Sequence, residues 1–129
     1  MINSDKPGKI NKRMYGNMGE SIAVNYLIQN NFTILNRNYR FGRFGEIDII
    51  ASENEYICFI EVKTRSNMLF GAPSEAVNYK KQNKIKKISQ MYLKEHEMLD
   101  RPQRFDVIEI IIEHNSSKPK NINLIRDAF

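Results

Sequence analysis

The sequence of 129 residues contains one cysteine, Cys58, which lies in an apolar run. A single cysteine excludes both an intramolecular disulfide and a zinc site built from cysteines. The sequence also has no run of about 18 apolar residues and no signal-peptide pattern, so we expect neither export nor a membrane span. Together these absences predict a protein of the reducing cytoplasm.

Acidic residues are fewer than basic ones. Lys and Arg number 20 against 15 Asp and Glu, and the net charge is +5. This balance favours a polyanionic partner, nucleic acid ahead of a membrane surface. The hydrophobic fraction of 41% and the charged fraction of 27% are typical of a globular protein. We expect a flexible basic segment over residues 1–13 and a single domain over residues 14–129.

Hydrophobic periodicity predicts two helices and several strands. One helix begins near Tyr15 and ends at the asparagines before Phe32, and a second runs from an N-cap at Ser74 to about Glu95. Strands are expected over residues 32–40, 46–51, 56–63 and 104–112, with residues 122–129 as a last short strand or extended tail. This order predicts an α/β fold, with an αβββαβ core and a mixed central sheet flanked by helices.

Asp48, Glu61 and Lys63 lie within two strands that are otherwise rich in isoleucine. If residues 52–55 form the hairpin loop, Asp48 lies opposite Phe59. Since side chains return to one face of a sheet at every second residue, all three charges then share a face. A two-residue loop would pair Asp48 with Glu61 and keep that face, whereas a loop of three or five residues would send Asp48 to the other face.

Two neighbouring carboxylates repel each other, and an unpaired buried carboxylate is strongly unfavourable, so we expect a cation beside them. Lys63 could be that cation in a structural ion-pair cluster. We favour a metal site, in which Asp48, Glu61 and the main-chain carbonyl of Val62 supply oxygen ligands for Mg²⁺ or Mn²⁺. A divalent ion in this position would activate water for hydrolysis of a phosphodiester.

Two further charged groups are candidates for this chemistry. We expect the carboxylates to raise the pKa of Lys63, which suits it to orient water and stabilise the transition state more than to accept a proton. Glu20 shares its helix face with Ala23, Val24 and Leu27. A carboxylate on a face that packs on the sheet indicates either an ion pair with Lys63 or an arginine, or a water-mediated place in the metal site. The candidate catalytic residues are therefore Glu20, Asp48, Glu61 and Lys63.

The pattern resembles a known nuclease signature. Asp48, followed on the next strand by "EVK", resembles the PD-(D/E)XK motif, although Ile47 stands where proline is common. The stretches "GNMGE", "RNYR", "GEIDIIA", "FIEVKTR", "FGAPSEAV" and "RFDVIEI" resemble the YraN-like family of uncharacterised bacterial proteins. That family is assigned to the restriction-endonuclease-like fold and likened to archaeal Holliday junction resolvases. The resemblance implies the same core, a metal held by Asp48 and Glu61, Lys63 beside it, and Glu20 as the helix acid.

Basic residues outside these acids predict contacts with a nucleic acid. Three lysines form a stripe along the second helix that could follow a phosphate backbone, although a solvated helix face explains them equally well. An arginine lies just past Lys63, and two more lie in a loop beside Phe41 and Phe44, where core packing of the rings is the simpler explanation. The predicted contacts are Arg40, Arg43, Arg65, Lys80, Lys84 and Lys87.

These features predict an endonuclease that hydrolyses phosphodiester bonds of DNA with Mg²⁺ or Mn²⁺. The likeness to resolvases adds branched DNA as a substrate and a homodimer as the assembly, because a junction has two-fold symmetry. The alternative is a non-catalytic nucleic-acid-binding protein with a nuclease-like fold, in which the acids are structural and the basic helix binds.

Overall fold

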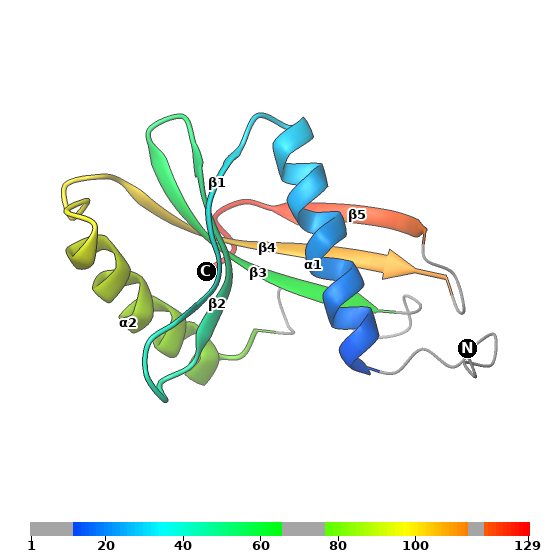
Figure 1. The fold of residues 1–129 in the computed structure, drawn as a ribbon, viewed down its shortest axis with the longest axis horizontal. Helices are drawn as coiled ribbons and strands as arrows, with labels where there is room; N and C mark the ends of the chain where they lie inside the picture. The colour runs from blue at the N-terminus through cyan, green and yellow to red at the C-terminus, as the bar shows by residue number, and fades with distance from the viewer. Residues whose placement is uncertain (1–11, 66–76, 114–117) are drawn as a thin grey trace, which may run out of the picture.

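The computed structural model describes residues 12–65, 77–113 and 118–129. These form two helices and five strands, in the order α1 (Lys12–Gln29), β1 (Thr33–Arg40), β2 (Glu46–Glu53), β3 (Tyr56–Arg65), α2 (Tyr79–Glu95), β4 (Gln103–Ile112) and β5 (Pro119–Ile125). One sheet has the order β1-β2-β3-β4-β5, with β3 and β4 parallel and the other neighbours antiparallel. The predicted α/β fold, with a mixed sheet flanked by helices, is confirmed (Figure 1).

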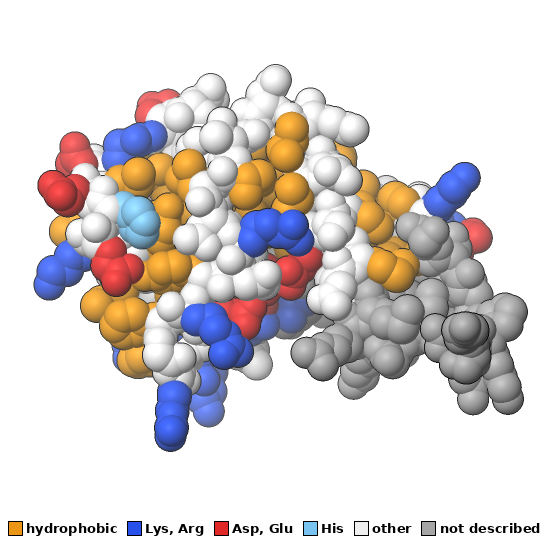
Figure 2. All heavy atoms as spheres, viewed as in Figure 1, with side chains coloured by type: hydrophobic (Ala, Val, Ile, Leu, Met, Phe, Trp, Pro, Cys, Tyr) orange, Lys and Arg blue, Asp and Glu red, His pale blue; other side chains and the backbone are white. Residues whose placement is uncertain are grey.

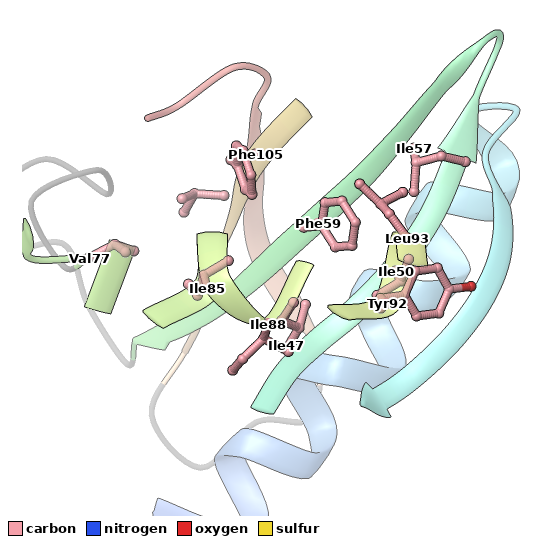
Figure 3. Packing of buried hydrophobic residues seen from close by; sticks show 11 residues of the cluster. Ile47, Ile50, Ile57, Phe59, Val77, Ile85, Ile88, Tyr92, Leu93 and Phe105 are labelled. Atoms are coloured by element: carbon pink, nitrogen blue, oxygen red, sulfur yellow. The ribbon is translucent and has the colours of Figure 1, made fainter. Parts of the chain in front are cut away.

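The two helices cover opposite faces of the sheet (Figure 1). On the α1 side, Leu27 shares a buried cluster with Cys58 and Ile60 of β3. On the α2 side, Ile88 packs with Phe59 in a second cluster (Figure 3). β3 is therefore buried on both faces, which explains its nearly continuous apolar sequence. Neither helix of the described part of the chain has the length and hydropathy needed to span a bilayer.

The β2–β3 hairpin is tighter than predicted. The strands pair as far as Glu53 opposite Tyr56, so the loop is residues 54–55 rather than residues 52–55. Asn54 adopts a φ of 55°, a left-handed conformation that asparagine tolerates in turns. The side chain of Glu53 is bound by arginines, so this polar residue can continue the strand.

The shorter loop changes which residues of β2 and β3 pair with each other. It does not change the side of the sheet on which their side chains lie. Phe59 lies opposite Ile50, so the predicted pairing of Phe59 with Asp48 is wrong. Continuing the same register by one pair beyond Ile49 and Ile60 places Asp48 opposite Glu61. Because both loops have an even number of residues, Asp48 stays on the face predicted for it.

Both helices begin at other residues than predicted. α1 begins at Lys12, before Tyr15, and so overlaps the end of the predicted lead-in; residues 1–11 lie outside the described residues. α2 begins at Tyr79, after the N-cap Asn78, whose side chain accepts a hydrogen bond from the amide of Lys81 at 2.9 Å. Ser74, the predicted cap, lies outside the described residues. Serine and asparagine are comparable caps, so propensity alone does not distinguish the two positions.

α1 lies very close to β3 at Gly19, which is buried. A Cβ atom at this position would overlap the hydroxyl of Thr64. Glycine therefore allows the helix to approach the strand closely, and the next residue, Glu20, lines a cavity together with Lys63 and Thr64.

Candidate active site

β2 and β3 separate at Asp48. Their pairing starts at Ile49 and continues toward the turn, while the amide of Val62 donates a hydrogen bond to Oδ2 of Asp48 at 2.9 Å. Ile47 and Ile50 both pack on the α2 side, so strict alternation along β2 is interrupted around Asp48. The Asp48 carboxylate is thus attached to β3 at the point where the two strands part.

Glu61 is buried and has an oxygen without a partner. The side chain is 3% exposed. Its Oε2 lies 3.9 Å from Nζ of Lys63 and forms an ion pair with Lys81 of α2. Its Oε1 is buried and accepts no hydrogen bond within the described part of the chain. Because an unpaired buried acceptor is unfavourable, Glu61 has the capacity for one further ligand.

Asp48 has a strongly perturbed carboxyl group. Burial, followed by the negative charge of Glu61, raises the pKa of Asp48 from 3.8 to about 8. The hydrogen bond from Val62 opposes this rise, and a side-chain hydrogen bond with Glu61 and the charge of Glu20 add to it. The carboxylates therefore repel each other despite the lysines, and a divalent cation between them would remove that repulsion.

The pKa values of the two lysines are shifted in opposite directions. Burial lowers the pKa of Lys63, and the positive charge of Lys81 lowers it further against the opposing effect of Glu61. Burial also lowers the pKa of Lys81, but its hydrogen bond to Glu61 outweighs this and the pKa is raised. The predicted rise in the pKa of Lys63 is wrong, because burial lowers this pKa and because Lys81 takes the closer ion pair with Glu61. We call Asp48, Glu61, Lys63 and Lys81 the acid–lysine cluster.

Lys81 is absent from the residues predicted for the site, although the sequence contained a signal for it. It lies four and seven residues before Ile85 and Ile88, which are both buried. Residues at this spacing share one face of a helix. A lysine on the apolar face of α2 therefore indicated an ammonium directed at the sheet.

Glu20 reaches the site from α1. Its Oε1 accepts a hydrogen bond at 3.0 Å from Nδ2 of Asn38, which also donates to Oε2 of Glu46 at 3.0 Å. The described partner of Glu20 is therefore an amide rather than the predicted Lys63 or arginine. Asn38 has a φ of 52° and lies opposite Asp48 in the β1–β2 register. Neither Asn38 nor Glu46 was predicted, because their approach to Glu20 depends on tertiary packing.

Two cavities meet at the acid–lysine cluster, one of about 430 Å³ beside α2 and one of about 290 Å³ beside α1. The first is lined by Phe44, Gly45, Glu46, Asp48, Glu61, Asn78, Lys80, Lys81, Lys84, Ile85 and Ile88. The second is lined by Gly16, Glu20, Asp48, Glu61, Val62, Lys63, Thr64 and Lys81. Both therefore open onto the same two carboxylates. Figure 2 shows acidic and basic side chains close together near the middle of the face that it draws.

The ligand atoms at this site suit a hard divalent ion that takes only some of its ligands from the protein. No group of three or more His, Cys, Asp and Glu residues in the described ranges is arranged to hold a metal. Asp48 and Glu61 alone would supply side-chain ligands. Mg²⁺ is commonly bound by one or two carboxylates, with water and substrate phosphate completing its octahedron. The unpaired Oε1 of Glu61 and the raised pKa of Asp48 fit such an ion.

Comparison with known proteins identifies relatives that match most of this chain. Residues 19–110 match the model of "Uncharacterised protein family UPF0102". The chain belongs to this family, as the YraN-like resemblance implied. A UPF0102 protein of Acetivibrio thermocellus is 46% identical over 130 residues, covering 99% of this chain and 100% of the relative. UPF0102 proteins of Caldicellulosiruptor bescii and Clostridium kluyveri are 48% and 49% identical, over 93% and 88% of this chain and 100% and 92% of the relatives. None of these names states an activity.

The predicted nucleic-acid contacts of this UPF0102 chain occupy different surroundings. Lys80 and Lys84 line the cavity beside α2, and Lys87 lies farther along the same helix. Arg43 is exposed in the β1–β2 loop. Two of the arginines are held by acids: Nε of Arg40 lies 3.2 Å from Glu46, and Nε of Arg65 lies 3.0 Å from Glu109. Contact with phosphate stays a prediction for all six.

A second charged cluster, which we call the arginine cluster, joins Glu53, Arg104, Asp106 and Arg126. Arg104 lies 2.6 Å from Glu53 and 2.9 Å from Asp106, and Arg126 lies 2.7 Å from Glu53. The amide of Asp127 also donates to Asp106 at 2.9 Å. The hydrogen bond from Arg126 is the main reason that the pKa of Glu53 is lowered to about 2, with burial opposing and Arg104 assisting. Arg104 and Asp106 are two residues apart on β4, so their side chains lie on one face of the sheet.

Proposed function

We propose that this UPF0102 protein is a metal-dependent endonuclease that hydrolyses phosphodiester bonds of DNA. The observation that carries the proposal is the buried pair Asp48 and Glu61, which has an unpaired oxygen and a raised carboxyl pKa at the junction of two cavities. In a structural ion-pair cluster each acid has a cation of its own, whereas both lysines of this cluster pair with Glu61. Here the acids lie against each other, which is the arrangement that a divalent cation stabilises.

The metal ligands in this proposal are the carboxylates of Asp48 and Glu61 and the main-chain carbonyl of Val62. Mg²⁺ or Mn²⁺ bound there would polarise the phosphate and lower the pKa of a bound water. Lys63, whose own pKa is lowered, is suited to accept a proton from the attacking water as well as to orient it. Lys81 stays protonated beside Glu61 and would stabilise negative charge that develops on the phosphate.

Glu20 has a positioning role in this proposal. It lines the α1-side cavity together with Lys63, and Asn38 holds its carboxylate. From this position it would orient a water molecule and would not bind the metal directly. Lys80 and Lys84, at the opposite cavity, would bind the phosphates that flank the one cleaved.

A cleavage assay tests the proposal. Purified protein is incubated in Mg²⁺ or Mn²⁺ with single-stranded, duplex, flap and four-way-junction DNA of the same sequence. We expect cleavage of at least one substrate, abolished by EDTA and reduced roughly 100-fold or more by Asp48→Asn or Lys63→Met. Asp100→Asn and Lys94→Met alter exposed residues and serve as matched controls.

Failure to cleave any substrate, or unchanged cleavage by both site variants, would count against an enzyme. The preference for branched DNA and the homodimer rest on the likeness to resolvases. The same substrate panel tests the first, and light scattering with and without a junction tests the second.

A second candidate function is non-catalytic binding of nucleic acid. It is favoured by the ion pair between Lys81 and Glu61, which partly neutralises the acids without metal. In that case DNA affinity would fall steeply with salt and would not respond to Mg²⁺. Calorimetric titration with Mg²⁺ separates the candidates, because the nuclease requires binding that Glu61→Gln abolishes.

A further inference from the structure

An exposed phenylalanine stands at the edge of the candidate active site. Phe44 lies in the β1–β2 loop and is 45% exposed. The loop is held by hydrogen bonds from the amide of Phe41 to Gly45 at 3.2 Å and from the amide of Phe44 to Phe41 at 3.0 Å. Gly42 has a φ of 53°, which suits glycine. The backbone of the loop therefore presents the ring to solvent, although burying it would be favourable.

The ring borders an apolar cavity of about 300 Å³ between the loop and α2. The lining residues are Phe41, Phe44, Lys87, Ile88, Gln90 and Met91. The centroids of the two rings are 6.4 Å apart, with their planes inclined by 36°. Nζ of Lys87 lies 5.8 Å from the centroid of Phe44. The cavity thus combines aromatic and aliphatic walls with a cation at the rim.

This cavity adjoins the one that contains the carboxylates. Phe44 and Ile88 line both. Along α2, Lys81 of the acid–lysine cluster and Lys87 of the apolar cavity are six residues apart, or about 9 Å at 1.5 Å per residue. A nucleic acid strand whose phosphate lies at Asp48 and Glu61 could therefore place a neighbouring nucleotide at the apolar cavity.

We propose that this cavity binds an unpaired base of a DNA strand, stacked on Phe44, next to the phosphate at the acid–lysine cluster. The inference rests on the proposed function and names the substrate class that the site takes. Charge complementarity selects this occupant: Lys80 and Lys84 line the adjoining cavity, so the chain that enters is polyanionic. A base has a flat face that stacks on an aromatic ring whatever its sequence.

The bound base has to be unpaired, because only an unpaired base exposes a face that can stack on the ring. In a duplex the faces of the bases are covered by their neighbours, so a base can stack on a protein ring only after it leaves the helix. Single strands, flaps and junctions with unpaired nucleotides present such bases at lower energetic cost. The cavity therefore selects DNA with unpaired bases over fully paired duplex.

The test uses a single-stranded oligonucleotide that carries 2-aminopurine, whose fluorescence is quenched by stacking. The wild-type protein is titrated in EDTA, so that binding is measured without cleavage. We expect quenching on binding, loss of that quenching in Phe44→Ala, and an affinity about tenfold weaker. Phe44→Tyr should restore both signals, whereas Phe44→Leu, which keeps an apolar side chain, should not. Leu99→Ala, at a residue 59% exposed and outside the cavity, is the matched control.

Equal quenching and affinity in wild type and Phe44→Ala would overturn the proposal, as would equal affinity of the wild type for duplex and single strand. A change of oligomeric state in Phe44→Ala, with DNA binding intact, would identify the patch as an interface between copies and would also overturn it. Cleavage and 2-aminopurine quenching are measured separately, so the base site and the proposed nuclease activity can fail independently. Cleavage that persists without stacking refutes the base site alone, and stacking without cleavage supports the base site and refutes the enzyme.

Discussion

Asp48 and Glu53 are two of the acids of β2, and they have opposite environments. Glu53 lies between two arginines and has a pKa lowered to about 2, whereas Asp48 lies against Glu61 and has a pKa raised to about 8. They are five residues apart along one strand, or about 17 Å. Burial is the main cause of the raised pKa of Asp48 and the negative charge of Glu61 adds to it, whereas the hydrogen bond from Arg126 outweighs burial at Glu53.

The difference separates a structural cluster from a candidate site. In the arginine cluster the wholly buried Asp106 is bound by Arg104 and by the amide of Asp127, so the group stabilises the attachment of the C-terminal segment to β4. In the acid–lysine cluster, Oε1 of Glu61 has no hydrogen-bond partner among the described residues. Such a group is unfavourable in the isolated protein, which is typical of a position adapted to a ligand.

The largest expected effect comes from breaking the arginine cluster. Arg104→Ala removes the guanidinium that binds Asp106 and should lower the free energy of unfolding by about 3–5 kcal/mol, measured by urea denaturation. Arg37→Ala, at an exposed position, should change it by less than about 0.5 kcal/mol. A loss below about 1 kcal/mol in Arg104→Ala would contradict a structural role for the cluster.

A divalent metal ion should stabilise the protein through the acid–lysine cluster and not through the arginine cluster. At a free Mg²⁺ concentration about 100 times its Kd, binding to the folded state should stabilise the protein by about 2.7 kcal/mol, seen as a rise in Tm. Asp48→Asn and Glu61→Gln should lose this rise, and Glu53→Gln should keep it. An equal rise in all variants would indicate a general salt effect and no site.

Neutralising an acid of the acid–lysine cluster should stabilise the protein without metal. Because the pKa of Asp48 is raised from 3.8 to about 8, the folded state binds the proton more tightly than the unfolded state. The free energy of unfolding should therefore fall as pH rises through this range. Asp48→Asn keeps an acceptor for the amide of Val62 and should add about 1–2 kcal/mol above pH 8. A destabilised Asp48→Asn would show that the carboxylate is needed for folding.

The smallest effect is expected when Glu53 of the arginine cluster is protonated at acid pH. The pKa of Glu53 is lowered from 4.5 to about 2, so its contribution is present above pH 4.5 and is lost as pH falls toward 2. Partial exposure screens the interaction, and we expect about 1 kcal/mol. Thermal melts across this range should show a shallower acid loss in Glu53→Gln than in wild type. Parallel curves would place the acid sensitivity elsewhere.

Much of the fold was predictable because it follows from local periodicity. Alternation in the hairpin placed Asp48, Glu61 and Lys63 on one face, and an even-numbered loop preserved that result although the loop length was wrong. The helix starts were less predictable, because Asn78 and Ser74 are similar caps and packing decides between such positions.

The partners of the site residues were predicted less well. The direction of the pKa shift of Lys63 was wrong because burial lowers the pKa most, and because the charge of Lys81, which comes from a different element and binds Glu61, lowers it further. Asn38 was not predicted at all, since a polar residue in a strand carries no signal that it will join acids from two other elements.

The sequence by itself determined the α/β order, the shared face of the acids and the membership of the UPF0102 family, because these depend on residue type and on spacing along one chain. Only the tertiary structure decided which cation pairs with Glu61, which oxygen is left unpaired, and where Phe44 opens onto the carboxylates. The physical reason is that charge interactions and burial depend on distances between elements, and those distances exist only once the helices have packed on the sheet.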